Sequence, residues 1–152
     1  MEAVLFVGIQ GSGKTTFYRE KFFETHVRIS LDMLKTRHRQ NVLLSACLAA
    51  GQPFVVDDTS ATKARRAELI AAARAAGFRV AGYYFRTTLG DAIRRNKSRA
   101  RVVPAGGVGA TYKRLEPPSR PEGFDDLRVV EILPGGGFAV SDWPGEDPPP
   151  KP

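Results

Sequence analysis

A glycine-rich motif of fixed spacing, GIQGSGKT at residues 8–15, restricts the fold of this chain more than any other feature. It fits the pattern G-x-x-x-x-G-K-[ST]. An apolar run, AVLFV, precedes it at residues 3–7, and the following KTTFYREKFFETH is expected to begin a helix. A strand, a glycine turn and a helix N-terminus direct backbone N–H groups and partial positive charge at an anion. The motif therefore predicts a phosphate-binding loop between a strand and a helix.

The motif also predicts what is bound. The glycines keep side chains out of the loop where backbone N–H groups approach phosphate oxygens. Lys14 supplies a point charge for the β- and γ-phosphates, and Thr15 supplies a hydroxyl to Mg²⁺. We therefore expect ATP and Mg²⁺ as cofactors, with Thr15 as the metal ligand. The residues expected to contact the nucleotide here are Gly8, Gly11, Ser12, Gly13, Lys14, Thr15 and Thr16.

Strand-like and helix-like segments alternate along the remaining chain. Further strands are expected at residues 27–30, 53–58, 78–85 and 126–132, with helices at 32 to about 50, 61–77 and 89–101. This alternation is typical of an α/β fold with a mostly parallel sheet. We predict a P-loop NTPase-type sheet of about five strands flanked by helices, with a helical lid after the fourth strand.

The C-terminal part of the chain is rich in proline and glycine. Both residues interrupt the segment 103–124, where we expect one short helix around residues 111–115. The domain is predicted to span residues 1–133, and an extended or loose tail is expected at 134–152. Trp143 could anchor this tail on the domain.

Composition limits the compartment and the partners. No apolar run approaches the roughly 20 residues that a membrane helix needs, so we expect no membrane contact. The single cysteine, Cys47, fits a reducing cytoplasm, and neither histidine has metal-ligand spacing to it. The net charge of +7 favours a polyanionic partner such as nucleic acid or nucleotide, or reflects only a basic surface. No obligate protein partner is evident.

Ligands of parallel α/β sheets bind at the carboxyl ends of the strands, where two further polar clusters fall. In the first, SLDMLK at residues 30–35, Asp32 follows a strand and begins a helix. It is placed either to accept the proton of an acceptor hydroxyl or merely to cap the helix. Lys35 is three residues further on, so it is expected on the same helical face, where it could hold a phosphate of the acceptor.

The second cluster, VVDDTS at residues 55–60, ends a buried strand with two acids. It resembles a Walker B element, whose carboxylate helps to hold magnesium. Alternatively, Asp58 orients a basic group of the acceptor site, or Asp58 or Thr59 caps the next helix. A third cluster, RRNKSRAR at residues 94–101, is basic. On a lid, an arginine can stabilise charge on a transferred phosphoryl group, whereas most charge runs are simply solvated.

Together these segments resemble the P-loop kinase domain of the 5′-hydroxyl polynucleotide kinases. The resemblance rests on GIQGSGKTTF, ISLDML, VVDDTS, RRNKSRARVVP and EPPSRPEGFDDLRVVEI, and it spans most of residues 3–132. It implies Asp32 as the general base for the 5′-hydroxyl and Arg99 as the lid arginine on the donor phosphates, with Arg95 as a lesser candidate. The implied catalytic residues are Lys14, Asp32 and Arg99, and the implied substrate-binding residues are Lys35 and Asp58.

The chain departs from that family at several positions, and three functions stay open. Lys35 replaces an arginine that is frequent in the family, D-D-T-S replaces D-N-T-N, and AGGVGA occupies the lid. The first hypothesis is ATP-dependent phosphorylation of a 5′-hydroxyl end of DNA or RNA. The second is a P-loop kinase acting on a small-molecule hydroxyl, such as a nucleoside, sugar or antibiotic. The third is a non-catalytic ATP-binding regulator, which would need none of the acids and lid arginines.

Overall fold

A mixed β-sheet organises the chain and brings the polar clusters to one edge. The computed structural model describes residues 1–99 and 102–152, and within them the sheet has six strands in the order β2-β3-β1-β4-β5-β6. The strands are β1 (Glu2–Val7), β2 (Val27–Ile29), β3 (Phe54–Val56), β4 (Arg79–Phe85), β5 (Asp126–Ile132) and β6 (Phe138–Asp142). The first five strands run parallel and β6 pairs antiparallel with β5. The predicted α/β class is confirmed.

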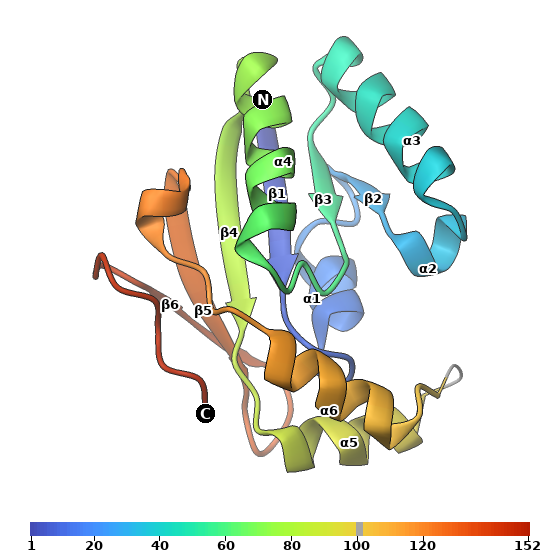
Figure 1. The fold of residues 1–152 in the computed structure, drawn as a ribbon, viewed down its shortest axis with the longest axis vertical. Coiled ribbons are helices and arrows are strands. Elements are labelled where there is room, and N and C mark those ends of the chain that lie inside the picture. The colour runs from blue at the N-terminus through green and yellow to red at the C-terminus, as the bar shows by residue number, and fades with distance from the viewer. Residues whose placement is uncertain (100–101) are drawn as a thin grey trace.

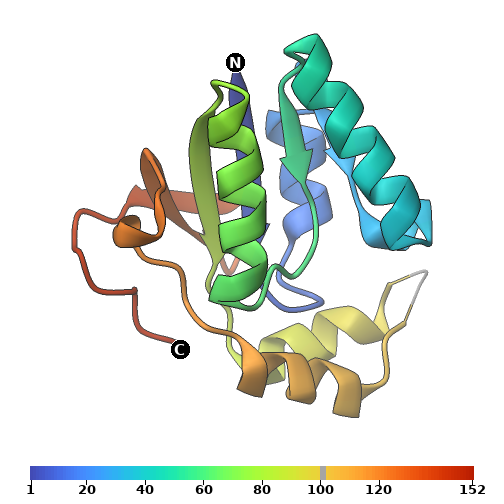
Figure 2. The same cartoon turned by 45° about the horizontal axis from the view of Figure 1, so that its top comes forward.

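Helices cover both faces of the sheet and close its carboxyl end (Figures 1 and 2). The helices are α1 (Lys14–Lys21), α2 (Leu31–Leu34), α3 (Arg37–Ala50), α4 (Lys63–Ala75), α5 (Leu89–Lys97), α6 (Ala105–Arg114) and the 3-10 turn η1 (Arg120–Glu122). Successive strand residues point to opposite faces, so Leu5 packs in the cluster under α3 and α4 while Phe6 packs against α1. Helices α5 and α6 lie across the carboxyl ends of the strands as the predicted helical lid.

The sixth strand comes from the segment that was expected to be an extended or loose tail. Phe138 lies opposite Ile132 of β5, and its ring meets that of Phe17 in α1 at 5.1 Å between centroids. Trp143 then donates its backbone N–H to the carbonyl of Leu127, and its ring packs on the core. It therefore anchors this segment on the domain, which the sequence alone did not establish. Glycines at the turn between β5 and β6 made this hairpin look unstructured in sequence.

Two predicted helices have different limits. The helix expected from residue 32 to about 50 is broken at Lys35, whose φ of 73° lies in the left-handed region, and α3 starts afresh after the Thr36 cap. The glycine-rich segment that predicted only a short helix around residues 111–115 instead forms α6 from Ala105. Buried Val108 packs α6 onto the core, so tertiary contacts outweigh the low helix propensity of its glycines.

None of the helices in the described residues is long and apolar enough to cross a membrane.

Candidate active site

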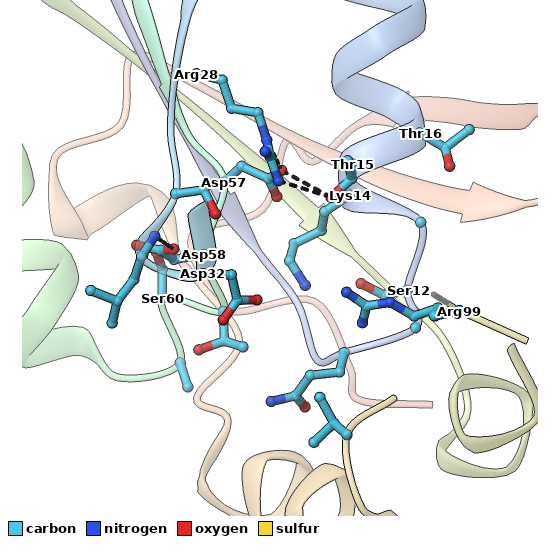
Figure 3. Close-up of a pocket in the computed structure, with 18 of the residues that line it drawn as sticks. Ser12, Lys14, Thr15, Thr16, Arg28, Asp32, Asp57, Asp58, Ser60 and Arg99 are labelled. Atoms are coloured by element: carbon cyan, nitrogen blue, oxygen red, sulfur yellow. Dashed lines mark hydrogen bonds and ion pairs between the residues drawn. The ribbon is translucent and has the colours of Figure 1, made fainter. Parts of the chain in front are cut away.

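A cleft of about 1150 Å³ opens at the carboxyl ends of the strands (Figure 3). It brings together the glycine-rich loop, α2, the segment after β3 and two lid arginines. The sequence-predicted residues that line it are Gly11, Ser12, Gly13, Lys14, Thr15, Thr16, Asp32, Asp58, Arg95 and Arg99. Gly8 is buried, and neither Gly8 nor Lys35 is among the described residues that line the cleft. The predicted convergence of the clusters therefore holds, apart from these two positions.

The glycine-rich loop needs glycine at two positions for steric reasons. Gly11 has a φ of 79°, and a Cβ atom on it would lie 2.3 Å from the carbonyl oxygen of Ala92 in α5. Gly13 has a φ of 94° and directly precedes the first residue of α1. No other amino acid adopts these backbone angles so readily. The close approach also couples the loop to the lid helix.

The amine of Lys14 lies inside the loop, where it donates to the carbonyl oxygens of Gly8 at 2.9 Å and Ile9 at 2.8 Å. Burial lowers the pKa of Lys14 from 10.5 to about 8, with Asp57 opposing this effect and Arg99 adding to it. Among the described residues, the buried hydroxyl oxygen of Ser12 has no hydrogen-bond partner. Such a cation beside unsatisfied polar groups is suited to receive a phosphate.

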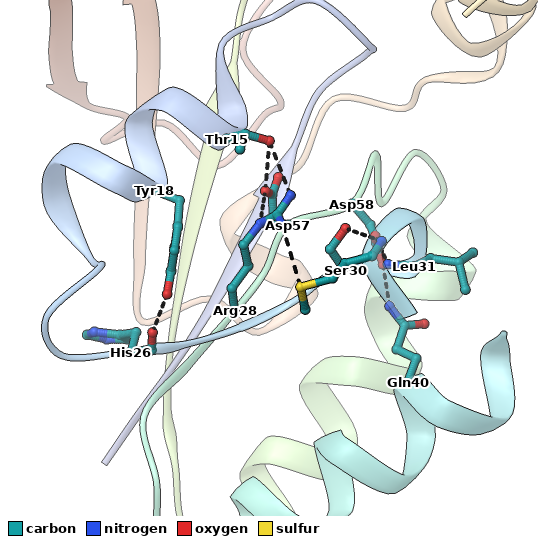
Figure 4. Close-up of polar contacts among 10 residues, drawn as sticks. Thr15, Tyr18, His26, Arg28, Ser30, Leu31, Gln40, Asp57 and Asp58 are labelled. Atoms are coloured by element: carbon teal, nitrogen blue, oxygen red, sulfur yellow. Dashed lines mark hydrogen bonds and ion pairs between the residues drawn. The ribbon is translucent and has the colours of Figure 1, made fainter. Parts of the chain in front are cut away.

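Thr15, Asp57 and Arg28 form a closed polar triangle next to the loop (Figure 4). The Thr15 hydroxyl donates to Oδ2 of Asp57 at 3.0 Å, and Nε of Arg28 donates to the same oxygen at 2.8 Å. A hydroxyl and a carboxylate are hard oxygen ligands of the kind that Mg²⁺ prefers, so this pair would fit that ion. Within the described ranges no three acidic, histidine or cysteine side chains gather as a metal site.

Asp58 lines the cleft and contacts the two helices that follow β2. Its Oδ1 accepts the backbone N–H of Leu31 at 2.8 Å, and its Oδ2 accepts a short hydrogen bond from the Gln40 amide. Its two carboxylate oxygens thus hold α2 and α3, one oxygen to each helix. The helix-cap interpretation of Asp58 and Thr59 is wrong, because Thr62 caps α4.

Asp32 lines the cleft from α2, and it acts electrostatically on the Lys14 amine across that space. The cap of α2 is Ser30, whose hydroxyl accepts from the N–H of Met33, so the interpretation of Asp32 as a helix cap is wrong. Lys35 ends α2 in a non-helical conformation with an exposed side chain. It therefore does not share a helical face with Asp32, and Arg37 lines the cleft instead.

The basic run divides into residues that face the cleft and residues that face solvent. Arg95 donates to the carbonyl of Gly11 at 3.5 Å and to Thr87 at 3.0 Å, and Arg99 lines the cleft opposite the acids. Arg94 is exposed and pairs with Asp91 of its own helix. The run therefore has members that line the cleft and a member that is solvated, while residues 100 and 101 lie outside the described residues. The stabilisation of a transferred phosphoryl group by a lid arginine stays a prediction.

Three contributors to the site were missed by sequence reasoning. None of the three was given a role of its own from the sequence. Arg28 lies in a short predicted strand, Asp57 was named only as part of VVDDTS, and Gln40 lies inside a predicted helix. Gln40 is almost completely buried, and its Oε1 accepts from Arg65 at 3.2 Å and also from Arg37. The strand alternation between Val27 and Ile29 was the available signal for Arg28, since it puts that side chain on the face of α1.

The sheet, the loop and the cleft define a P-loop nucleotide-binding protein. The chain belongs to the AAA domain family, a P-loop NTPase kinase-like family whose model matches residues 4–118.

Solved structures of similar fold include a gluconokinase, Kti12 and a chain of a toxin-antitoxin system. A gluconokinase from Sinorhizobium meliloti 1021 has a TM-score of 0.59 at 16% identity, covering 86% of this chain and 82% of that chain. Kti12 from Chaetomium thermophilum in complex with ADP-AlF3 has a TM-score of 0.59 at 17% identity, covering 85% and 88%. A chain of the PezAT toxin-antitoxin system of Streptococcus pneumoniae has a TM-score of 0.63 at 15% identity, covering 92% and 70%. At these identities the likeness shows the fold.

Proposed function

We propose that this chain transfers the γ-phosphoryl group of ATP to a hydroxyl group of a small-molecule acceptor. The observation that carries this proposal is Asp32, a carboxylate that shares the cleft with the phosphate-binding loop and acts on the charge of Lys14. Nucleotide binding alone does not require a carboxylate there. The kinase-like family and the gluconokinase of similar fold support the proposal.

The size of the cleft suits two ligands. Its volume of about 1150 Å³ exceeds the roughly 300–1,000 Å³ of an ordinary ligand pocket. ATP would lie on the loop, with its phosphates at the backbone N–H groups and at Lys14. Thr15 and Asp57 would hold Mg²⁺, which when bound supplies positive charge to the phosphate oxygens. The acceptor would then lie between Asp32 and Arg37.

The transfer step assigns one task to each side chain. The acceptor oxygen forms a bond to the γ-phosphorus while the bond to the β–γ bridging oxygen breaks, and ADP leaves. Asp32 accepts the proton of the acceptor hydroxyl. Lys14 and Arg99 stabilise negative charge on the phosphoryl oxygens during transfer. Asp58 holds α2, and with it Asp32, through the Leu31 N–H.

A 5′-hydroxyl end of DNA or RNA is a second candidate acceptor, and one observation favours it. Arg37 and Arg65 both line the cleft on the acceptor side and both donate to Gln40. Two converging guanidinium groups suit a phosphate next to the reacting hydroxyl. The basic net charge of +7 is in keeping with such a polyanion.

The proposal is tested by following transfer of labelled γ-phosphate from ATP to a panel of hydroxyl compounds. The panel contains sugar acids, nucleosides, phosphorylated sugars, and 5′-hydroxyl oligonucleotides of DNA and RNA. Turnover of a small molecule with inert oligonucleotides supports the main proposal, and the opposite pattern replaces it with the second candidate. Tight ADP binding without transfer to any acceptor would favour the regulator.

Asp32→Asn tests the assigned base once an acceptor is found. We expect kcat to fall about 100- to 10,000-fold, because proton transfer to a positioned carboxylate contributes that much. ADP affinity should stay within about 2-fold, since Asp32 makes no predicted contact with ADP. The control is Glu20→Gln, which removes another carboxylate that lines the cleft and should retain activity. Undiminished transfer by Asp32→Asn would exclude it as the base.

A further inference from the structure

Arg28 reaches the phosphate-binding loop because of the strand on which it lies. Val27 and Ile29 pack in the core cluster on the side of α3 and α4, so the residue between them points to the opposite face, where α1 lies. In the parallel register, Arg28 is opposite Val55, which precedes Asp57 by two residues. Arg28 and Asp57 therefore point to the same face from neighbouring strands.

The guanidinium group of Arg28 occupies the atoms that a metal ion would need. Its Nε shares Oδ2 of Asp57 with the Thr15 hydroxyl, and its Nη2 donates to the Thr15 oxygen at 3.3 Å. The Asp57 side chain is only 2% exposed, whereas that of Arg28 is 25% exposed. The cation thus caps a buried carboxylate from the solvent side of the cleft.

Mg²⁺ demands oxygen ligands at about 2.0–2.1 Å in near-ideal octahedral geometry. It cannot take the Thr15 and Asp57 oxygens while a guanidinium group is bonded to both. We propose that Arg28 and Mg²⁺ compete for the Thr15–Asp57 pair, and that Arg28 acts as a built-in cation that supports nucleotide binding without metal. The proposal rests on the part of the proposed function that places a magnesium nucleotide at this loop, and not on the acceptor.

Arg28 can leave the pair without unfolding the site. Its Nη1 faces the sulfur atom of Met33 at 3.9 Å, and Met33 is itself exposed on α2. The guanidinium group also lines the open cleft. A rotation of the side chain into that space would free both oxygens, and the positive charge would stay beside the bound phosphates.

The test measures ADP affinity by calorimetry, once in excess EDTA and once in excess MgCl₂. The quantity compared between variants is the dissociation constant in EDTA divided by the dissociation constant in MgCl₂. Arg28→Gln keeps a donor for Asp57 and removes the charge. Arg19→Gln is the matched control, because Arg19 also lines the cleft but lies on the exposed side of α1. Binding of ADP is required of the loop alone, so a failed transfer assay leaves this test intact.

We expect the wild type to bind ADP with similar affinity in both buffers, within about 10-fold. In Arg28→Gln this ratio should be larger than in the wild type by a factor of about 10 to 100, because a charge-assisted hydrogen bond contributes a free energy of that size. Arg19→Gln should keep the wild-type ratio. An unchanged ratio in Arg28→Gln, or tighter binding in EDTA, would overturn the proposal. If Arg28→Gln does not fold, Arg28→Met carries the same test, because it also removes the positive charge beside Asp57 and Thr15.

Discussion

The amine of Lys14, held inside the glycine-rich loop, gives the unfolding free energy of this chain a pH dependence. Burial lowers its pKa from 10.5 to about 8. Between these values the unfolded chain binds more protons than the folded chain, so the free energy of unfolding rises with pH across the window. The full difference corresponds to about 3 kcal/mol, of which about 2 kcal/mol falls between pH 7 and 9.5. Stability is thus reduced at neutral pH by a charge that the loop requires.

The perturbation that isolates this contribution is Lys14→Met, which keeps the length of the side chain and removes the amine. Urea unfolding of the wild type and the variant is followed by circular dichroism at pH 7 and 9.5, without nucleotide or divalent cations. Groups that titrate alike in both chains cancel in the comparison. We expect the wild type to gain about 2 kcal/mol relative to the variant on going from pH 7 to 9.5.

Lys21→Met is the control, because it removes an exposed lysine from the last turn of the same helix. Its unfolding free energy should follow that of the wild type at both pH values. A relative gain below about 0.5 kcal/mol for the wild type over Lys14→Met would refute the reasoning. It would mean that the Lys14 amine is solvated in the nucleotide-free protein, rather than held against the Gly8 carbonyl.

Two further predictions concern the loop and its support. Gly11→Ala should lower the free energy of unfolding by at least about 1–2 kcal/mol and weaken ADP binding more than about 10-fold. The reason is that the new Cβ would clash with the Ala92 carbonyl and that the φ of residue 11 is positive. The control is Gly90→Ala, which has open space around it and should be neutral or slightly stabilising. Arg66→Met should cost about 3–5 kcal/mol in urea unfolding, because it strands the Glu122 carboxylate that Arg66 holds in a buried pair. Adding Glu122→Gln should recover part of that loss, and no recovery would contradict a charge-based cost.

The loop and the sheet could be predicted because local rules and the final structure agree. A strand, glycines and a helix start are each recognisable within a few residues, and the structure has β1 and α1 where the motif predicts them. The order of the strands and the sixth strand could not be predicted in the same way. Strand order depends on pairing between segments that are far apart in sequence, and β6 also packs on α1 through the contact of Phe138 with Phe17.

Roles were harder to predict than positions. In the segment EPPSRPEGFDD, which contributes to the resemblance to a kinase family, the acids Glu122 and Asp125 make structural contacts. Glu122 binds the buried Arg66, and Asp125 accepts the backbone N–H of Val80 at 2.8 Å. Arg66 in turn donates to the carbonyl of Ser60, so this segment supports the loop after β3. Sequence patterns do not separate such support from chemistry, because both use charged residues at fixed spacing.

The two adjacent acids after β3 contact two different parts of the cleft. Asp57 still continues the strand, since its N–H donates to Ile29 of β2, and its carboxylate points to the face of α1 and binds Thr15. The next residue, Asp58, must point to the other side, and its carboxylate binds α2 through Leu31. One acid therefore contacts the start of α1, next to the glycine-rich loop, and the other contacts the helix that carries Asp32. A chain that exchanged either acid for asparagine should lose one half of the site and keep the other: Asp57→Asn should change the magnesium dependence of ADP binding, and Asp58→Asn should lower transfer with ADP binding intact.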